Sequence, residues 1–386
     1  MTFFYLRTVL FYLMEHMYVF FRLKSRLGNK RTFWLFFPWF VFMACYPVLF
    51  QLLPPEGQAL EWLTPVVRVW LPLVYVCFIV LLLLDLGRLA LWGLQRLRPS
   101  FDLSAHTRRT CAYVLIAVMA MIYGYGLYEA RTLGVTYLTL RTEKLPAGAK
   151  AVRIAFISDL HIGPHTGKDM LRNTVRTVLS EKPDIILLGG DILDDSLQGR
   201  PGPMSALANL HAPYGVFSVL GNHDGYGPVQ RAMDFLKGAG ITLLSNEIKE
   251  AGPLSIIGID DPHVSAQKGE LMYDPMPLLA AADRSRFTIL LEHRPVMREE
   301  AAGLMDLQLN GHTHGGQTIF LKVLMRLTGT HPEGIKPLKG KEGQSVAYVT
   351  RGVGFSKLPI RVLTPPEVVI IDLERNPEGA PPSQNN

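Results

Sequence analysis

Five short clusters of aspartate, asparagine and histidine stand out in the second half of the chain. They are SDLHIG at 158–163, GGDILDD at 189–195, GNHD at 221–224, EHRP at 292–295 and GHTHGGQ at 311–317. Carboxylate, amide and imidazole ligands without thiolate suit borderline divalent metals such as Mn, Fe and Zn. Two metals about 3.5 to 4 Å apart, sharing one carboxylate, can clamp both ends of an in-line displacement at phosphorus. The clusters therefore predict a dinuclear centre for phosphoester chemistry.

Apolar segments precede most of these clusters and predict the strands that position them. Strands are expected at 152–158, 184–188, 216–220, 255–259, 287–291, 307–310, 345–350 and 367–373, and helices at 168–181 and 229–239. Alternation of strands and helices favours an α/β domain, with sheets covered by helices. Ligands that follow strands, next to glycine, can converge on one cleft. The Pro-rich, polar stretch 376–386 predicts a disordered tail.

The five clusters in this order resemble the calcineurin-like metallophosphoesterase superfamily. GHTHGGQ together with RGVGFSKLPIRVLTPPE at 351–367 is similar to its membrane-associated, YkuE-like branch, which includes transmembrane proteins with a metallophosphoesterase domain. The resemblance covers residues 135 to 375 and implies a β-sandwich flanked by helices.

The resemblance also implies a role for each matching residue. It implies that one metal is bound by Asp159, His161 and His314, that the other is bound by Asn222, His293 and His312, and that Asp191 bridges both. His223 matches the family's general acid or phosphate-contacting histidine, and we expect Asp224 to orient its ring. In such a site a metal-bridging hydroxide attacks phosphorus and His223 protonates the leaving oxygen.

Other polar residues are assigned structural roles. For the remaining histidines of the domain we expect packing or surface positions, namely His165, His211, His263 and His331. Asp194 and Asp195 are expected in a solvated loop or helix cap, with a supporting role in the site as the alternative. For Asp260 and Asp261 the sequence does not decide between a loop or cap position and a supporting role in the site. Arg351 is equally consistent with a phosphate contact and a surface ion pair, and is left out of the predicted site.

Composition points to a membrane and away from nucleic acid. Hydrophobic residues make up 48% and charged residues 19% of the 386 residues, with a net charge of +6. Much of the positive charge lies at 22–31 and 88–109, beside apolar stretches, as membrane-flanking charge does. We therefore expect no nucleic-acid partner. The three cysteines lie in or beside apolar stretches and form no metal or disulfide pattern.

The apolar stretches predict three or four transmembrane helices within a membrane domain at 1–130, followed by the phosphoesterase domain at 131–375. A spanning helix needs about 20 apolar residues. Segments 32–54 and 110–128 carry no charge, and 69–94 carries only Asp85 and Arg88, which can pair on one helix face. Segment 3–21 contains Arg7, Glu15 and His16, so it either spans or lies in the interface. No signal-peptide cleavage site follows it.

Lysine and arginine distribution predicts the orientation. Short basic loops stay in the cytoplasm, which places both basic clusters inside and the acidic loop at 54–64 outside. One further crossing puts everything after Arg131 on the extracytoplasmic side of a bacterial inner membrane.

The substrate is the least determined property. A membrane anchor favours a lipid-linked phosphoester or pyrophosphate. The alternative is UDP-2,3-diacylglucosamine pyrophosphatase activity in lipid A synthesis, which requires a cytoplasmic active site. Two further readings stay open: a non-catalytic metal-binding scaffold, and a transporter with an appended hydrolase. The sequence determines neither the metal nor the oligomeric state.

Overall fold

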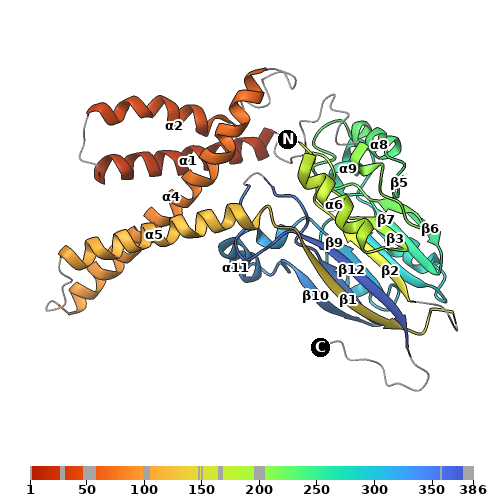
Figure 1. Ribbon diagram of the computed structural model, residues 1–386. Helices are drawn as coiled ribbons and strands as arrows, with labels where there is room; N and C mark the ends of the chain where they lie inside the picture. The colour runs from red at the N-terminus through yellow and green to blue at the C-terminus, as the bar shows by residue number, and fades with distance from the viewer. Residues whose placement is uncertain are drawn as a thin grey trace. The chain divides into compact units, whose positions relative to one another are not determined.

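The chain forms two compact units, Met1–Leu127 and Tyr128–Asn386, in a computed structural model (Figure 1). The predicted domain boundary at Arg131 lies close to this division. The structure describes residues 2–26, 31–46, 58–98, 105–146, 148, 151–163, 168–194, 205–356 and 359–376. His165, Asp195 and all but the first residue of the predicted tail lie outside the described residues.

The first unit is helical, with elements that run along the apolar segments of the sequence. It contains α1 (Thr2–Arg26), η1 (Arg31–Phe36), α2 (Phe37–Ala44), α4 (Gln58–Leu97) and most of α5 (Ala105–Glu129). Among the described residues one segment, Val69–Leu97, is long and apolar enough to cross a membrane, while Arg31–Ala44 and Tyr113–Glu129 are apolar but shorter. This supports the predicted span at 69–94. The other spans stay predictions, and part of 32–54 lies outside the described residues.

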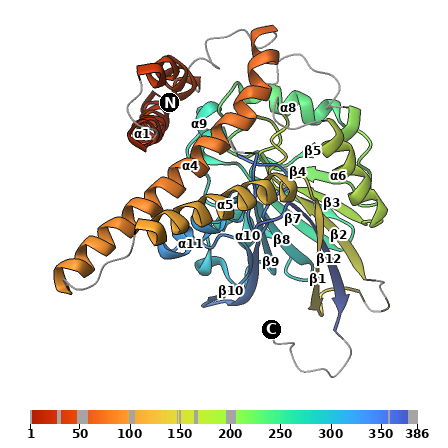
Figure 2. The same ribbon diagram turned by 60° about the vertical axis from the view of Figure 1, so that its left-hand side comes forward.

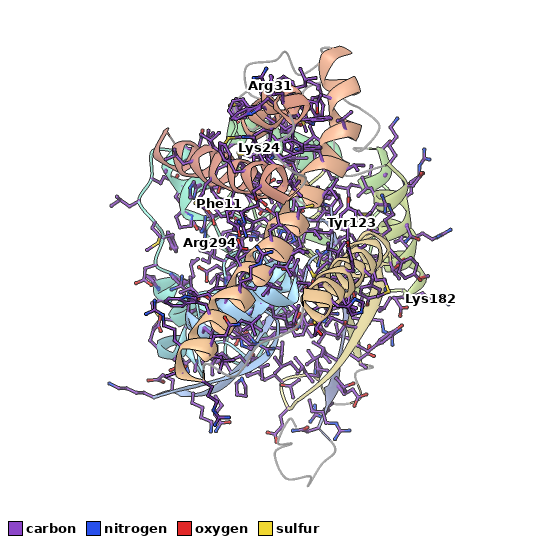
Figure 3. All side chains as sticks on the ribbon, turned by 90° about the vertical axis from the view of Figure 1, so that its left-hand side faces the viewer. Phe11, Lys24, Arg31, Tyr123, Lys182 and Arg294 are labelled. Carbon is purple, nitrogen blue, oxygen red and sulfur yellow. The ribbon has the colours of Figure 1, made fainter. Side chains whose placement is uncertain are left out.

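The predicted pairing of Asp85 and Arg88 within α4 extends to a second helix. Arg88 Nη1 lies 3.6 Å from Asp85 Oδ1, and α1 adds an ion pair from Arg22 and a hydrogen bond of 2.7 Å from the Tyr18 hydroxyl. Lys24, also in the first basic cluster, lies with Nζ 4.2 Å from the centroid of a tryptophan ring (Figure 3). The one acidic side chain in the apolar part of α4 is therefore neutralised by its neighbours.

The second unit contains two six-stranded mixed sheets, as the predicted sandwich requires. The first sheet has the order β1-β12-β2-β3-β4-β5 and the second β10-β11-β9-β8-β7-β6. Their strands are β1 (Gly134–Thr142), β2 (Val152–Ile157), β3 (Ile185–Leu188), β4 (Val216–Ser218), β5 (Thr242–Leu243), β6 (Glu247–Ala251), β7 (Leu254–Ile259), β8 (Phe287–Glu292), β9 (Leu307–Asn310), β10 (Gly334–Gly340), β11 (Gly343–Val349) and β12 (Glu367–Arg375).

Period-two side chains divide the core into layers. In β2, Ile154 and Phe156 pack between the sheets, while Ala155 and Ile157 pack on the outer face of the first sheet. Helices α6 (Lys168–Ser180) and α8 (Val229–Gly238) cover that outer face (Figure 2). Shorter helical pieces complete the unit: α9 (Pro262–Gln267), α10 (Met276–Ala281), η2 (Glu299–Ala301), η3 (His314–Gly316) and α11 (Ile319–Leu327). Strands with apolar residues on both faces are buried on both faces.

Every predicted strand is present, and four were missed. Strands β1, β5, β6 and β10 are the four edge strands of the two sheets, and they are short or carry exposed polar residues. Their sequences lack the continuous apolar run that marks a strand buried on both faces. Parallel pairing of β2 with β3 and β4, and of β7 with β8 and β9, brings the clusters that follow these strands to common edges.

Candidate metal centre

The structure brings together the three residues predicted for one metal. Asp159 and His161 follow β2, and His314 begins η3. One ligand atom from each lies within 4.8 Å of the others. The Nε2 atoms of His161 and His314 are 3.0 Å apart, and His314 Nε2 is 3.5 Å from Asp159 Oδ1. Two nitrogens bound to one metal at about 2.1 Å stand about 3.0 to 3.4 Å apart, so these spacings fit one cation.

A second set has the same spacing. Asp191 follows β3, His293 follows β8 and His312 follows β9, and one ligand atom from each again lies within 4.8 Å of the others. His293 Nε2 is 3.1 Å from Asp191 Oδ2 and 3.3 Å from His312 Nδ1. Imidazole nitrogens that face one another so closely need a cation or a shared proton between them.

Asp191 lies between the two sets. Its Oδ2 atom is 3.1 Å from His293 Nε2 in the second set and 3.6 Å from His161 Nε2 in the first. Its Oδ1 atom accepts a hydrogen bond of 2.8 Å from the backbone N–H of His223. One oxygen is thus held by the backbone while the other faces imidazoles of both sets.

Asn222 carries the observation that most directly points to a role as a metal ligand. Its amide nitrogen donates to the Tyr226 hydroxyl at 2.9 Å, which fixes the orientation of the amide. Its Oδ1 atom is buried, with no hydrogen-bond partner among the described residues. Native proteins rarely leave a buried amide oxygen unsatisfied, and an oxygen ligand for a divalent metal meets that requirement.

The backbone at the ligands is strained. Five of them have positive φ angles: Asp159 (57°), His161 (45°), Asp191 (51°), His312 (74°) and His314 (52°). Side chains other than glycine rarely adopt this conformation, and it persists where the surrounding structure enforces it, commonly at functional sites. The sequence did not predict this feature.

Asp224 has contacts different from those predicted, and Asp194 takes the predicted role. Both carboxylate oxygens of Asp224 accept backbone hydrogen bonds, from Ile192, Leu193 and Gly221. His223 Nδ1 instead lies 3.1 Å from Asp194 Oδ1. The expectation of a solvated loop or cap position for Asp194 was therefore wrong. Ile192 and Leu193 extend the parallel backbone pairing beyond β3, which turns Asp194 towards the histidines.

Comparison with known proteins identifies the family. The family model of the calcineurin-like phosphoesterases matches residues 152–316. A metallophosphoesterase of Aquifex aeolicus is 35% identical over 259 residues, which cover 67% of this chain and 98% of the relative. The chain belongs to the calcineurin-like phosphoesterase family. It is accordingly a metal-dependent phosphoester hydrolase.

Other relatives of this phosphoesterase extend the similarity. YkuE of Bacillus subtilis is 31% identical over 269 residues, covering 65% of this chain and 90% of YkuE. A Danio rerio protein named transmembrane protein with metallophosphoesterase domain is 27% identical over 346 residues, covering 86% of this chain and 77% of the relative. Matches to two Helicobacter pylori metallophosphoesterases span 60% of those proteins. The name of the Danio rerio relative and the apolar helix Val69–Leu97 indicate membrane association.

Arg361 supports the site of the phosphoesterase and was not singled out from the sequence. It is fully buried, its Nη2 lies 3.4 Å from His314 Nδ1, and it donates to the carbonyls of Gly352, Gly354 and Thr364. Burial and the charges of His161 and Arg361 hold the pKa of His314 well below its usual value. Neutral imidazole is the form that binds metals, so Arg361 keeps His314 ready for that role.

The Tyr226 ring lies against His223 and connects it, through His263, to Arg294. The Tyr226 ring lies 4.8 Å from that of His223 and 5.2 Å from that of His263. Arg294, labelled in Figure 3, directly follows the ligand His293 and lies with Nη2 3.2 Å from His263 Nδ1. The sequence signal for Arg294 was only its position inside the EHRP cluster.

The remaining predicted residues have structural contacts. Asp261 caps α9 and pairs with Arg294 at 2.6 Å. Asp260 pairs with Lys268 at 2.6 Å. Arg351 pairs with Glu367 at 2.5 Å, so the ion-pair reading of Arg351 holds, although Glu367 is buried.

The other described histidines outside the site fit their expected packing or surface positions. His211 is exposed and contacts the Asn209 carbonyl. His331 lies 3.3 Å from the Gly334 carbonyl.

Gly311→Ala should block the first metal position. A Cβ atom at Gly311 would lie 2.1 Å from Ser158 Oγ and 2.4 Å from Asp159 Oδ2, so the carboxylate must move. We expect a metal content about one ion per chain lower, with little metal-dependent activity, because a displaced ligand typically costs 10- to 100-fold in affinity. Gly227→Ala is the matched control, since nothing lies within 4 Å of its Cβ position. Full metal content in Gly311→Ala, measured by atomic emission, would contradict the assignment.

Metal binding should release protons. Burial alone would lower the pKa of His293. The charges of Asp191 and Asp159 outweigh burial and raise this pKa to about 10 in the metal-free protein. Below that pH the ring holds a proton, which a metal must displace, so affinity should rise with pH by about tenfold per unit for each proton lost. Titration calorimetry in buffers of different ionisation enthalpy measures the released protons. Affinity that is constant between pH 6 and 8 would show that no ligand is protonated.

Proposed function

We propose that the chain is a membrane-anchored, dinuclear phosphoesterase that hydrolyses a lipid-linked phosphoester or pyrophosphate. The position of Asp191 between two ligand sets carries the dinuclear part of this proposal. Asp159, His161 and His314 would hold one ion and Asn222, His293 and His312 the other, with Asp191 shared. The donor set suits Mn, Fe or Zn.

Two divalent ions held there would activate water as the nucleophile and offset negative charge on the phosphoryl oxygens. The protein's own residues supply the remaining steps. His223 lies in the loop after β4, where its backbone N–H contacts Asp191, and we assign it to protonation of the leaving oxygen. Asp194 contacts its Nδ1 atom, so the proton that is transferred must sit on Nε2.

Asp194 is the residue that orients the ring of His223. Burial opposes ionisation of its carboxyl, but hydrogen bonds from His161 and His223 hold the pKa of Asp194 far below its usual value. An ionised carboxylate at Nδ1 stabilises the imidazolium form of the ring. Asp224 is different: burial and the charge of Asp191 raise its pKa to about 6, and it holds the backbone of two ligand loops together.

The membrane part of the proposal depends on the N-terminal unit. Val69–Leu97 meets the length and composition of a spanning helix, and a relative is named as a transmembrane protein. Basic clusters at 22–31 and 88–109 favour a multi-pass arrangement in a bacterial inner membrane, with the catalytic domain outside the cytoplasm. An anchored enzyme meets substrates in its own bilayer at high local concentration, which favours a lipid-linked substrate.

Activity and three substitutions test the catalytic assignment. The full chain loaded with Mn, Fe or Zn should release phosphate or phosphoester products from at least one monoester, diester or pyrophosphate. Asp191→Ala should lose metal and activity together, whereas His223→Ala should keep both metals and lose about 10²- to 10⁴-fold in kcat. Asp194→Asn should lose about 10- to 100-fold in kcat with a changed pH profile.

His211→Ala is the matched control for these variants, because this exposed histidine lies outside the metal centre and contacts the carbonyl of Asn209. A protein that binds two metals yet cleaves none of the three substrate classes would refute catalysis. The chain would then be a metal-binding scaffold.

The side of the membrane decides between substrate classes. Compartment-sensitive reporters fused after Leu94 and at the C-terminus should report opposite sides, cytoplasmic for the first and extracytoplasmic for the second, because the basic cluster at 88–109 stays inside. Measurement in intact cells suffices. A cytoplasmic C-terminal reporter would contradict the proposed topology and make UDP-2,3-diacylglucosamine, cleaved at its pyrophosphate, the first substrate to assay.

A further inference from the structure

Helix α11, which follows the GHTHGGQ cluster, exposes five of its seven apolar side chains. None of its nine residues is buried. Its large exposed hydrophobics are Ile319 (43% exposed), Phe320 (54%), Val323 (47%), Leu324 (46%) and Leu327 (79%). These positions follow the spacing i, i+1, i+4, i+5 and i+8, which places them on one face of the helix. Single exposed leucines are common on soluble proteins, but a continuous apolar helix face marks an interaction surface.

A neighbouring leucine extends this face. Leu363 is 56% exposed and has a φ angle of 59°, a conformation that a leucine rarely adopts. Lys322 Nζ donates to the Leu363 carbonyl at 3.5 Å, and Val362 pairs with Thr318, the N-cap of α11. We call the five exposed apolar side chains of α11 together with Leu363 the apolar face.

The charge beside the apolar face is basic. Helix α11 has the sequence IFLKVLMRL, which contains two basic residues and no acidic one. Lys322 is paired with Glu333, whereas Arg326 is exposed. An amphipathic helix with large apolar side chains and flanking positive charge matches the surface of an anionic bilayer, where its apolar side chains enter the boundary between headgroups and acyl chains.

The apolar face is joined to the metal centre at two points. The ligand His314 lies five residues before Ile319 in the chain, and Arg361, which contacts His314, lies two residues before Leu363. The backbone between them is held by the Thr364 hydroxyl, which donates to the Gln317 carbonyl at 2.7 Å. Whatever binds the apolar face is therefore held within a few residues of the catalytic ligands.

We propose that the apolar face of α11 and Leu363 inserts into the interface of an anionic lipid bilayer, holding the metal centre at the membrane surface. This inference rests on the proposed membrane anchoring, because an anchored domain meets a bilayer at high local concentration. The basic flank favours lipid over a neutral apolar protein partner. Docking of this kind would deliver a lipid-linked phosphate to the metals without complete extraction from the bilayer.

Fluorescence quenching in vesicles tests the proposal without requiring turnover. The full chain, with Cys45, Cys77 and Cys111 replaced by serine, is labelled with an environment-sensitive dye at Phe320→Cys and reconstituted into phosphatidylcholine and phosphatidylglycerol vesicles. The matched control carries the dye at Lys237→Cys, an exposed position in α8, which lies apart from α11 in Figures 1 and 2. We expect doxyl-labelled lipid to quench the dye at position 320, and aqueous iodide to quench it at position 237.

A second pair of variants separates insertion from loss of folding. Leu324→Ser and Leu327→Ser should each reduce the ratio of docked to undocked domain about tenfold, since each removes one large apolar side chain from the bilayer. Leu271→Ser, at a leucine that is 91% exposed outside α11, should leave the quenching unchanged. Thermal unfolding and metal content of each variant report on the fold.

Each outcome decides the inference. Iodide quenching at position 320 would place α11 in water and overturn it. Protection from both quenchers would mean that protein covers the apolar face, from a second copy or from the chain's own helices, and would also overturn it. A chain that does not float with vesicles would refute anchoring as well, whereas metal-dependent hydrolysis in detergent would still support the phosphoesterase assignment.

Discussion

The burial of one carboxylate organises the catalytic domain. Asp191 is almost completely buried, and burying a charge is costly unless partners neutralise it. Its partners are His161, which follows a strand of the first sheet, and His293, which follows a strand of the second. Because the neutralising groups come from both sheets, the site can form only where the two sheets meet. It forms correctly only when the two sheets pack against each other in the native arrangement.

The same dependence explains the backbone at the ligands. Five predicted ligands hold positive φ angles, and glycines occupy positions 190, 221 and 311, where a Cβ atom would collide with neighbouring atoms. Such conformations cost about 1 to 3 kcal/mol each and survive only where the surroundings over-determine them. Here the apolar core between the sheets supplies that rigidity, with Ile154, Phe156 and Leu309 fully buried. The site is strained because its scaffold is rigid.

The catalytic domain and its apolar face suggest one physical design. The ligands lie on loops after buried strands, while α11 extends from the last of these loops with no buried residue of its own. A helix that contributes nothing to the core gains its stability from capping by Thr318 and from whatever covers its apolar face. Placing this helix next to a metal ligand couples surface recognition to the position of the metals.

The sequence by itself determined the chemistry and much of the scaffold. The eight predicted strands are those with continuous apolar runs, and the seven predicted ligands follow such strands, because strand burial and ligand type are both local properties of the chain. Tertiary structure decided which carboxylate serves His223. The sequence favours Asp224, which directly follows His223, but the pairing of the backbone beyond β3 turns Asp194 towards the ring and leaves Asp224 to bind backbone amides. The contact of Arg361 with His314 and the four edge strands were not predicted. These features depend on residues far apart in the chain or on neighbouring strands, and no local pattern records such contacts.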